Sequence, residues 1–147
     1  MRTLIAAISF SVLVASAGLS LAASDLAQQR EADMKAIAGA VKTSSEFVTG
    51  KAPFDAAAAR AAMETVAAKA ADFPTLFPPG SETASKAASP KIWQDNADFE
   101  AHAARLASSA KAAAAAADGG LDAFKAAFGA VAENCKSCHQ TYRLSTR

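Results

Sequence analysis

The sequence predicts an all-α protein folded as an antiparallel four-helix bundle, and three observations lead to this expectation. Hydrophobic residues make up 52% of the 147 residues, but many of them are alanine, which favours helix because it loses no side-chain entropy there. β-branched and aromatic residues are sparse, and no alternating strand-like run stands out. Four helical segments, each with an apolar stripe and mostly joined by short links, are typical of a bundle.

The first 22 residues are expected to be a signal peptide. Arg2 supplies a positive start, the run from Leu4 to Val14 is almost wholly apolar, and Ser20-Leu21-Ala22 fits a small-x-small cleavage site. An uncleaved membrane anchor is the rival interpretation, because residues 4–23 are long enough to span a bilayer. The Ser and Gly content of the segment favours cleavage near Ala22, which leaves a periplasmic protein with one bundle domain over residues 23–147.

The first two helices are predicted from their end signals. The first runs from Asp25 to Val48 and stops near Gly50 and Pro53, two residues that interrupt helices. The second covers residues 55–71, and a loop rich in proline follows it.

The third and fourth helices are separated by a clear breaker. Ser89-Pro90 is a helix start, with Ser as N-cap and Pro at the first helical position, and the third helix then runs to Ala117. Asp118-Gly119-Gly120 ends it, and the fourth helix covers residues 121–143. The apolar stripe of the fourth helix is the most regular, with steps of three and four residues through Leu121, Phe124, Phe128, Val131, Cys135, Cys138 and Tyr142.

The charge balance gives no sign of a polyanionic partner. The formal net charge is +1, and removal of Arg2 with the signal peptide would leave the polypeptide neutral. Neither value favours a nucleic-acid partner or a strongly charged docking face. We also expect no membrane association after cleavage.

The chemistry of the chain is concentrated in Cys135-Lys136-Ser137-Cys138-His139, a C-x-x-C-H motif. This motif is the attachment signature of c-type haem. Two thiols at i and i+3 lie on one helical face, so each can form a thioether with a haem vinyl group. The imidazole of His139 lies one turn beyond Cys135, from where it can reach the iron. We therefore expect one covalent haem c.

Three other uses of the cysteine pair fit less well. A thioredoxin-like redox pair would sit in a βαβ setting at the start of a helix, whereas this pair lies deep in the last helix. A zinc site would need further ligands, and no second C-x-x-C or spaced histidine pair completes it. Cysteines at i and i+3 within one helix also make a poor disulfide.

The sequence offers more than one candidate for a sixth iron ligand. Met34 lies on the apolar stripe of the first helix and could reach the haem from there, although a core methionine is the simpler interpretation. Met63 has the same simple interpretation, and His102 is more readily a surface or packing residue. Arg30 and Arg143 each lie one turn from a candidate ligand, where a guanidinium could pair with a haem propionate.

Four segments of the predicted mature chain carry a resemblance to a known family. They are Cys135-Lys136-Ser137-Cys138-His139 with Tyr142-Arg143 after it, Arg30-Glu31-Ala32-Asp33-Met34-Lys35, Gly50-Lys51-Ala52-Pro53-Phe54-Asp55 and Ser89-Pro90-Lys91-Ile92-Trp93. With them the chain resembles the class II c-type cytochromes, the cytochrome c′ family.

The resemblance implies a four-helix bundle with haem on Cys135 and Cys138 and with His139 as the proximal ligand. It makes Met34 the residue on the distal face and suggests that Arg30 and Arg143 lie near the haem. High-spin members of the family leave the iron five-coordinate and bind gases such as nitric oxide or carbon monoxide, and many form homodimers. Low-spin members use a first-helix methionine as sixth ligand.

The favoured function is one-electron transfer in the periplasm, with unidentified redox partner proteins and with His139 and Met34 on the iron. The residue after Pro74 is Thr75, where many high-spin members have tryptophan, and this departure favours the low-spin form. Gas binding at a five-coordinate iron is the alternative. An enzymatic role is not expected, because no distal acid/base pair is visible.

Overall fold

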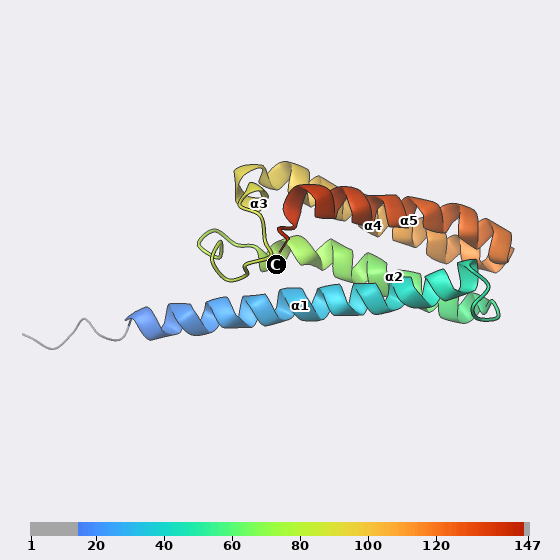
Figure 1. Cartoon of the computed structure of the whole chain (residues 1–147), viewed down its shortest axis with the longest axis horizontal. Coiled ribbons are helices and arrows are strands. Elements are labelled where there is room, and N and C mark those ends of the chain that lie inside the picture. Colours follow the sequence, from blue (N-terminus) through green and yellow to red (C-terminus); the bar gives the residue numbers. More distant parts are fainter. Residues whose placement is uncertain (1–14, 146–147) are drawn as a thin grey trace, which may run out of the picture.

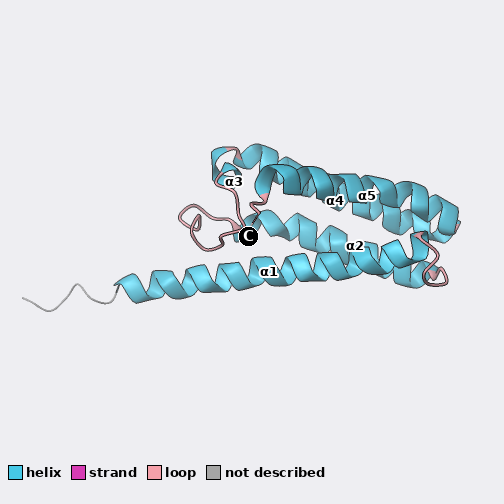
Figure 2. Cartoon of the chain, in the orientation of Figure 1, coloured by secondary structure: helices cyan, strands magenta, loops and turns pink. Residues whose placement is uncertain are grey.

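The computed structural model describes residues 15–145, with side chains from Ser24 onward, and it is almost entirely helical (Figures 1 and 2). Four long helices form the predicted antiparallel bundle, and one short helix and two 3-10 turns lie in the connections. The elements in chain order are α1 Ala15–Val48, α2 Ala56–Asp72, η1 Phe73–Leu76, α3 Lys91–Gln94, α4 Asn96–Ala116, η2 Ala117–Gly119 and α5 Leu121–Tyr142.

The predicted signal peptide falls largely outside the described residues. The described part of α1 begins at Ala15 and continues through Ala22 as helix, so cleavage near Ala22 stays a prediction. Across residues 15–145, no helix combines the length and the apolar character needed to span a bilayer.

The ends of the first two helices follow the local signals in the sequence. After α1 the backbone of Gly50 has a φ of 71°, the left-handed conformation that glycine adopts at little cost. Asp55 is the N-cap of α2, and its carboxylate accepts a 3.0 Å hydrogen bond from the backbone N–H of Ala58. The expected boundaries of this turn are confirmed.

The predicted continuous third helix is wrong, because Asp95 interrupts it. The backbone of Asp95 has φ −133° and ψ 62°, which is not helical, and its carboxylate accepts from the N–H of Asp98 at 3.4 Å. An aspartate side chain competes with the backbone for such N–H groups and so favours a new helix start over a helix interior. The expected cap also shifts, since Pro90 takes the N-cap position of α3 while the Ser89 hydroxyl accepts from Lys91 N–H.

The main core lies where α2 packs against both α1 and α4, and where α4 packs against α5. Ala110 and Ala113 of α4 are fully buried there, so their small side chains allow close helix approach. Helices α1 and α5 make far fewer contacts with each other than these pairs do. The alanines of α4 therefore tighten one side of the bundle and leave the α1–α5 side the least closed.

Phe124 is the largest fully buried side chain of the main core. Its ring centroid lies 5.7 Å from that of Phe54 and 5.8 Å from that of Phe128. Leu121, which the stripe also assigned to the core, is 36% exposed because it opens α5 at the end of the bundle. The predicted stripe is otherwise buried or half-buried.

A second, smaller core closes the other end of the bundle. Phe77, Ile92, Phe99 and Tyr142 form it, and Cys138 and Trp93 pack at its edge. The backbone after α5 joins this end to the loop before α3, since Ser89 N–H donates to Tyr142 O at 3.0 Å and Leu144 N–H donates to Ala87 O at 2.8 Å. The last turn of α5 is thereby held in place from both sides.

Arg30 connects α1 to the end of η1 and to the loop that follows it. Its side chain is only 5% exposed, and its Nε and Nη2 both donate to Leu76 O, at 3.0 and 2.8 Å. Nη2 also donates to the Ser81 hydroxyl at 2.7 Å, and the guanidinium lies 4.0 Å from the ring centroid of Phe77. A buried charge is tolerated here because backbone oxygens and an aromatic face replace its hydration.

We expect the Phe124→Ala variant to lose about 3–5 kcal/mol of unfolding free energy, because it removes a fully buried ring and leaves a cavity. Denaturant unfolding followed by circular dichroism measures this loss. Leu121→Ala, one turn earlier on α5, is the matched control and should cost far less. Equal losses in the two variants would contradict the described packing.

Replacing Arg30 with lysine should cost about 1–3 kcal/mol of unfolding free energy, because an ammonium cannot reproduce the fork that bonds Leu76 and Ser81. The same unfolding measurement applies. Lys35→Ala on the exposed side of α1 is the control and should leave the midpoint unchanged, since its ion pair with Glu31 is solvated. An unchanged midpoint for Arg30→Lys would show that the loop does not depend on this contact.

Candidate functional site

The C-x-x-C-H residues occupy the last two turns of α5. Cys135 and Cys138 are both free and half-buried, while His139 is exposed. Cys135 packs against the main core and Cys138 against the smaller one. The helix therefore presents two thiols and an imidazole together at the junction of the two cores, as their spacing predicts.

The environment of the motif shifts the pKa values of all three groups. Burial is the main cause that raises the pKa of the Cys135 and Cys138 thiols. Although the residue as a whole is exposed, partial loss of hydration at its ring, and then the positive charge of Arg143, lower the pKa of His139. Neutral imidazole is the form that binds a metal, so the iron-binding state of His139 is favoured over a wider pH range than in a free histidine.

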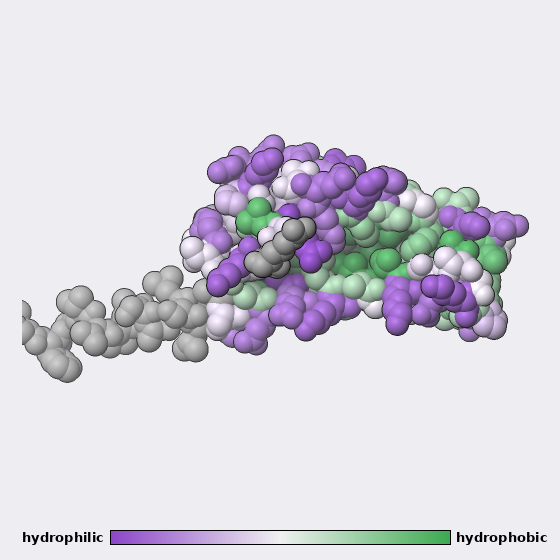
Figure 3. Space-filling model, viewed as in Figure 1, coloured by the Kyte–Doolittle hydropathy of each residue, from purple (hydrophilic) through white to green (hydrophobic). Residues whose placement is uncertain are grey.

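An apolar surface adjoins these residues on the α1–α5 side. Figure 3 shows a hydrophobic strip along this side of the bundle, bordered by hydrophilic residues. Met34 and Val41 of α1 and Ala127 and Cys135 of α5 are partly buried side chains packed against the main core. Two free thiols on one helical face, a neighbouring imidazole and an apolar surface beside them fit a covalently attached haem.

Met34 lies on α1, half-buried at the edge of the main core, as Cys135 does on α5. Asp33 beside it forms a 2.7 Å ion pair with Lys69 of α2, which holds this part of α1 against the bundle. Met63, by contrast, is fully buried in the core, as the simple packing interpretation expects. Ligation of iron by Met34 stays a prediction.

The two arginines expected near the haem are in different situations. Arg30 directs its Nε and Nη2 at the loop oxygens, and its Nη1 makes only a 3.4 Å contact with Ser81 O. Arg143 is exposed in extended backbone after α5. Contact of either guanidinium with a propionate stays a prediction.

Sequence reasoning did not identify the polar group beside Cys138. Asp98, His102 and Tyr142 meet there: the Tyr142 hydroxyl donates to Asp98 Oδ2 at 2.6 Å, and His102 Nε2 lies 3.4 Å from the same oxygen. The i, i+4 spacing of Asp98 and His102 was a local signal for part of this group. Tyr142 is 44 residues away from Asp98 in sequence, so no local pattern could have added it.

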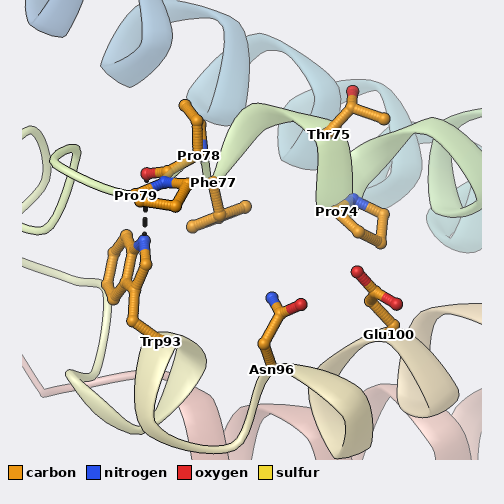
Figure 4. A pocket seen from close by; sticks show the side chains of 8 residues that line it. All are labelled: Pro74, Thr75, Phe77, Pro78, Pro79, Trp93, Asn96 and Glu100. Atoms are coloured by element: carbon orange, nitrogen blue, oxygen red, sulfur yellow. Dashed lines mark hydrogen bonds between the residues drawn. The ribbon is translucent and has the colours of Figure 1, made fainter.

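A separate cavity of about 340 Å³ lies between η1 and the α3–α4 turn (Figure 4). The Trp93 indole N–H donates to Pro78 O at 3.2 Å at one side of it. The lining contains none of the predicted haem-binding residues and consists of Pro74, Thr75, Phe77, Pro78, Pro79, Trp93, Asn96 and Glu100. This cavity is therefore distinct from the surface beside the motif.

Comparisons with known proteins agree with this geometry. Residues 25–143 match the family model described as Cytochrome C'. The chain is 40% identical to a cytochrome c-556 of Agrobacterium fabrum over 98% of this chain and 96% of that protein. It is 38% identical to a cytochrome c' of Rhodopseudomonas palustris over 90% of each chain.

Solved structures show the same bundle. Cytochrome c' from Rhodopseudomonas palustris superposes with a TM-score of 0.76 at 35% identity, over 84% of this chain and 98% of that chain. A nitric oxide complex of a mutant cytochrome c prime from Alcaligenes xylosoxidans superposes with a TM-score of 0.76 at 34% identity, over 84% and 97%. Together with the C-x-x-C-H motif at the end of α5, these matches show that the chain belongs to the cytochrome c′ family, whose members bind one covalent c-type haem.

Proposed function

We propose that the protein is a periplasmic electron carrier rather than an enzyme, in which Cys135 and Cys138 would hold one haem covalently and His139 and Met34 would bind its iron. The observation that carries this proposal is the position of the motif. Both thiols and the imidazole meet at the end of α5, beside an apolar surface to which α1 contributes Met34. Bound haem supplies a reversible one-electron change of its iron.

Each residue would contribute a different property to this carrier. The thiols of Cys135 and Cys138 fix the position of the group, and His139 offers a neutral nitrogen because burial and Arg143 lower its pKa. Met34 offers a thioether, a ligand that raises the reduction potential. The apolar side chains beside the motif restrict water, which also affects the potential. The electron donor and acceptor would be redox partner proteins.

Gas binding is the second candidate, and two observations favour it. One of the similar solved structures is a nitric oxide complex, and Met34 is only half-buried on the least closed side of the bundle. If the Met34 thioether only packs, the iron would keep a coordination position free for a small ligand. The two candidates therefore differ in whether Met34 coordinates.

We expect the purified ferrous protein to show sharp low-spin bands and no response to carbon monoxide, because Met34 occupies the sixth position. Met34→Leu should then give high-spin bands that shift on addition of carbon monoxide. Met63→Leu is the matched control, a buried methionine that should leave the spectrum unchanged. If Met34→Leu also leaves it unchanged, Met34 is not a ligand, and carbon monoxide binding by the unaltered protein would favour the gas-binding role.

Covalent attachment is tested separately with Cys135→Ala and Cys138→Ala. Each single variant should lose one thioether and the double variant should lose all covalent haem, as measured by mass spectrometry of the denatured chain. Ser137→Ala, between the two cysteines, should keep the full mass. Haem that stays covalently bound in the double variant would refute attachment at this motif.

A further inference from the structure

We propose that the cavity between η1 and the α3–α4 turn is a binding site for a small organic cation, one that carries an ammonium group on an apolar body. The apolar body would lie against the Trp93 end of the cavity, and the ammonium group would bind the Glu100 carboxylate. The inference goes beyond electron transfer and gas binding and uses none of the residues proposed for the haem. It does not depend on whether Met34 binds iron.

The cavity has the shape and the lining of a small ligand site. Trp93 and Pro79 lie at one end of it, Glu100 and Pro74 lie at the other, and Phe77 lies between them (Figure 4). Its volume of about 340 Å³ is at the small end of the range of ligand pockets, which extends from about 300 to 1,000 Å³. Many apolar groups and a few polar ones are also typical of such pockets. A small ligand with an apolar body therefore fits.

The lining has few hydrogen-bond donors left for a ligand. Its three prolines have no backbone N–H. The Trp93 indole N–H already donates to Pro78 O at 3.2 Å, and the Thr75 hydroxyl donates to Asp72 O at 2.7 Å. A ligand that fits this lining therefore brings donors of its own.

Asn96 and Glu100 supply the free acceptors. They are four residues apart on α4 and so share one face of the helix, and both side chains extend into the cavity (Figure 4). Neither side chain has a hydrogen bond or an ion pair with another described residue. Glu100 is also the one charged residue among the described residues of the lining. A carboxylate forms its stronger hydrogen bonds with charged donors, so the free groups favour a cation over an anion.

Arg30 lies close to the cavity but does not neutralise Glu100. Its guanidinium is 4.0 Å from the ring centroid of Phe77 and 5.7 Å from that of Trp93, and it is not part of the lining. Burial lowers the pKa of Arg30, and the negative charge of Glu82 opposes that shift. Glu82, and not Glu100, is therefore the carboxylate that acts on this guanidinium, which leaves Glu100 available to a cation from solution.

The first test titrates the purified holoprotein with benzylammonium at neutral pH. The chain has one tryptophan, so nuclear magnetic resonance can follow the Trp93 indole N–H as a single reporter of this cavity. We expect its signal to shift and to saturate. Benzyl alcohol has the same ring without the charge and should bind about fivefold more weakly, because it cannot form the ion pair. Equal affinities would overturn the assignment to a cation, and an unshifted signal would overturn the site.

The second test removes the charge from the protein. Glu100 is exposed, so we expect Glu100→Gln to fold and to bind benzylammonium about fivefold more weakly, with no change for benzyl alcohol. Glu64→Gln, on the exposed side of α2, is the matched control and should keep the affinity of the unaltered protein. The same affinity for benzylammonium in Glu100→Gln would refute the role of this carboxylate.

The indole signal also separates this cavity from a neighbouring groove. Pro74, Thr75 and Glu100 border a groove of about 540 Å³ between α2 and α4 as well, whereas Trp93 lines only the cavity. Benzylammonium in the groove would respond to Glu100→Gln without shifting the indole signal. That result would contradict the proposal, and a loss of affinity measured at the indole signal itself would support it.

Discussion

The candidate site depends on the geometry of one face of α5, and the surrounding structure keeps that face helical. Cys135, Cys138 and His139 can act together only if α5 stays helical through its last turn, where helices ordinarily fray. The structure prevents fraying with packing before the motif, through Phe124 and Phe128, and with backbone bonds after it, through Ser89 and Leu144. The loop before α3 therefore supports the site through its backbone bonds to the end of α5.

The unequal closure of the bundle has a simple origin in side-chain size. Fully buried alanines such as Ala110 and Ala113 bring α4 close to its neighbours, whereas α1 contributes longer side chains such as Met34 and Val41 at the edge of the core. Close packing on one side and looser contact on the other make the α1–α5 side, where Met34 and Cys135 lie, the least closed part of the bundle. Alanine content alone did not distinguish this arrangement from a uniformly tight bundle.

Local signals predicted much of the fold and of the candidate site, and long-range contacts account for what they missed. Residues close together in sequence determine the turn through Gly50 and Asp55 and the C-x-x-C-H spacing. Both features could therefore be predicted. The break at Asp95 was missed because Ser89-Pro90 is already a good helix start signal. The second start signal, Asp95, follows only five residues after Pro90 and was taken for helix interior. The burial of Arg30 depends on Leu76 and Ser81, 46 and 51 residues away, which no local pattern indicates.

The two sets of contacts that hold α1 near Met34 affect electron transfer as well as stability. Arg30 is hydrogen-bonded to Leu76 at the end of η1, and Asp33 is paired with Lys69 of α2, so the backbone that carries Met34 is held from two directions. Under the proposed ligation, the thioether would stay in nearly the same position when the iron changes charge. A site whose ligands move little has a small reorganisation energy, and rapid electron exchange would then follow from the contacts that Arg30 and Asp33 make with the rest of the protein.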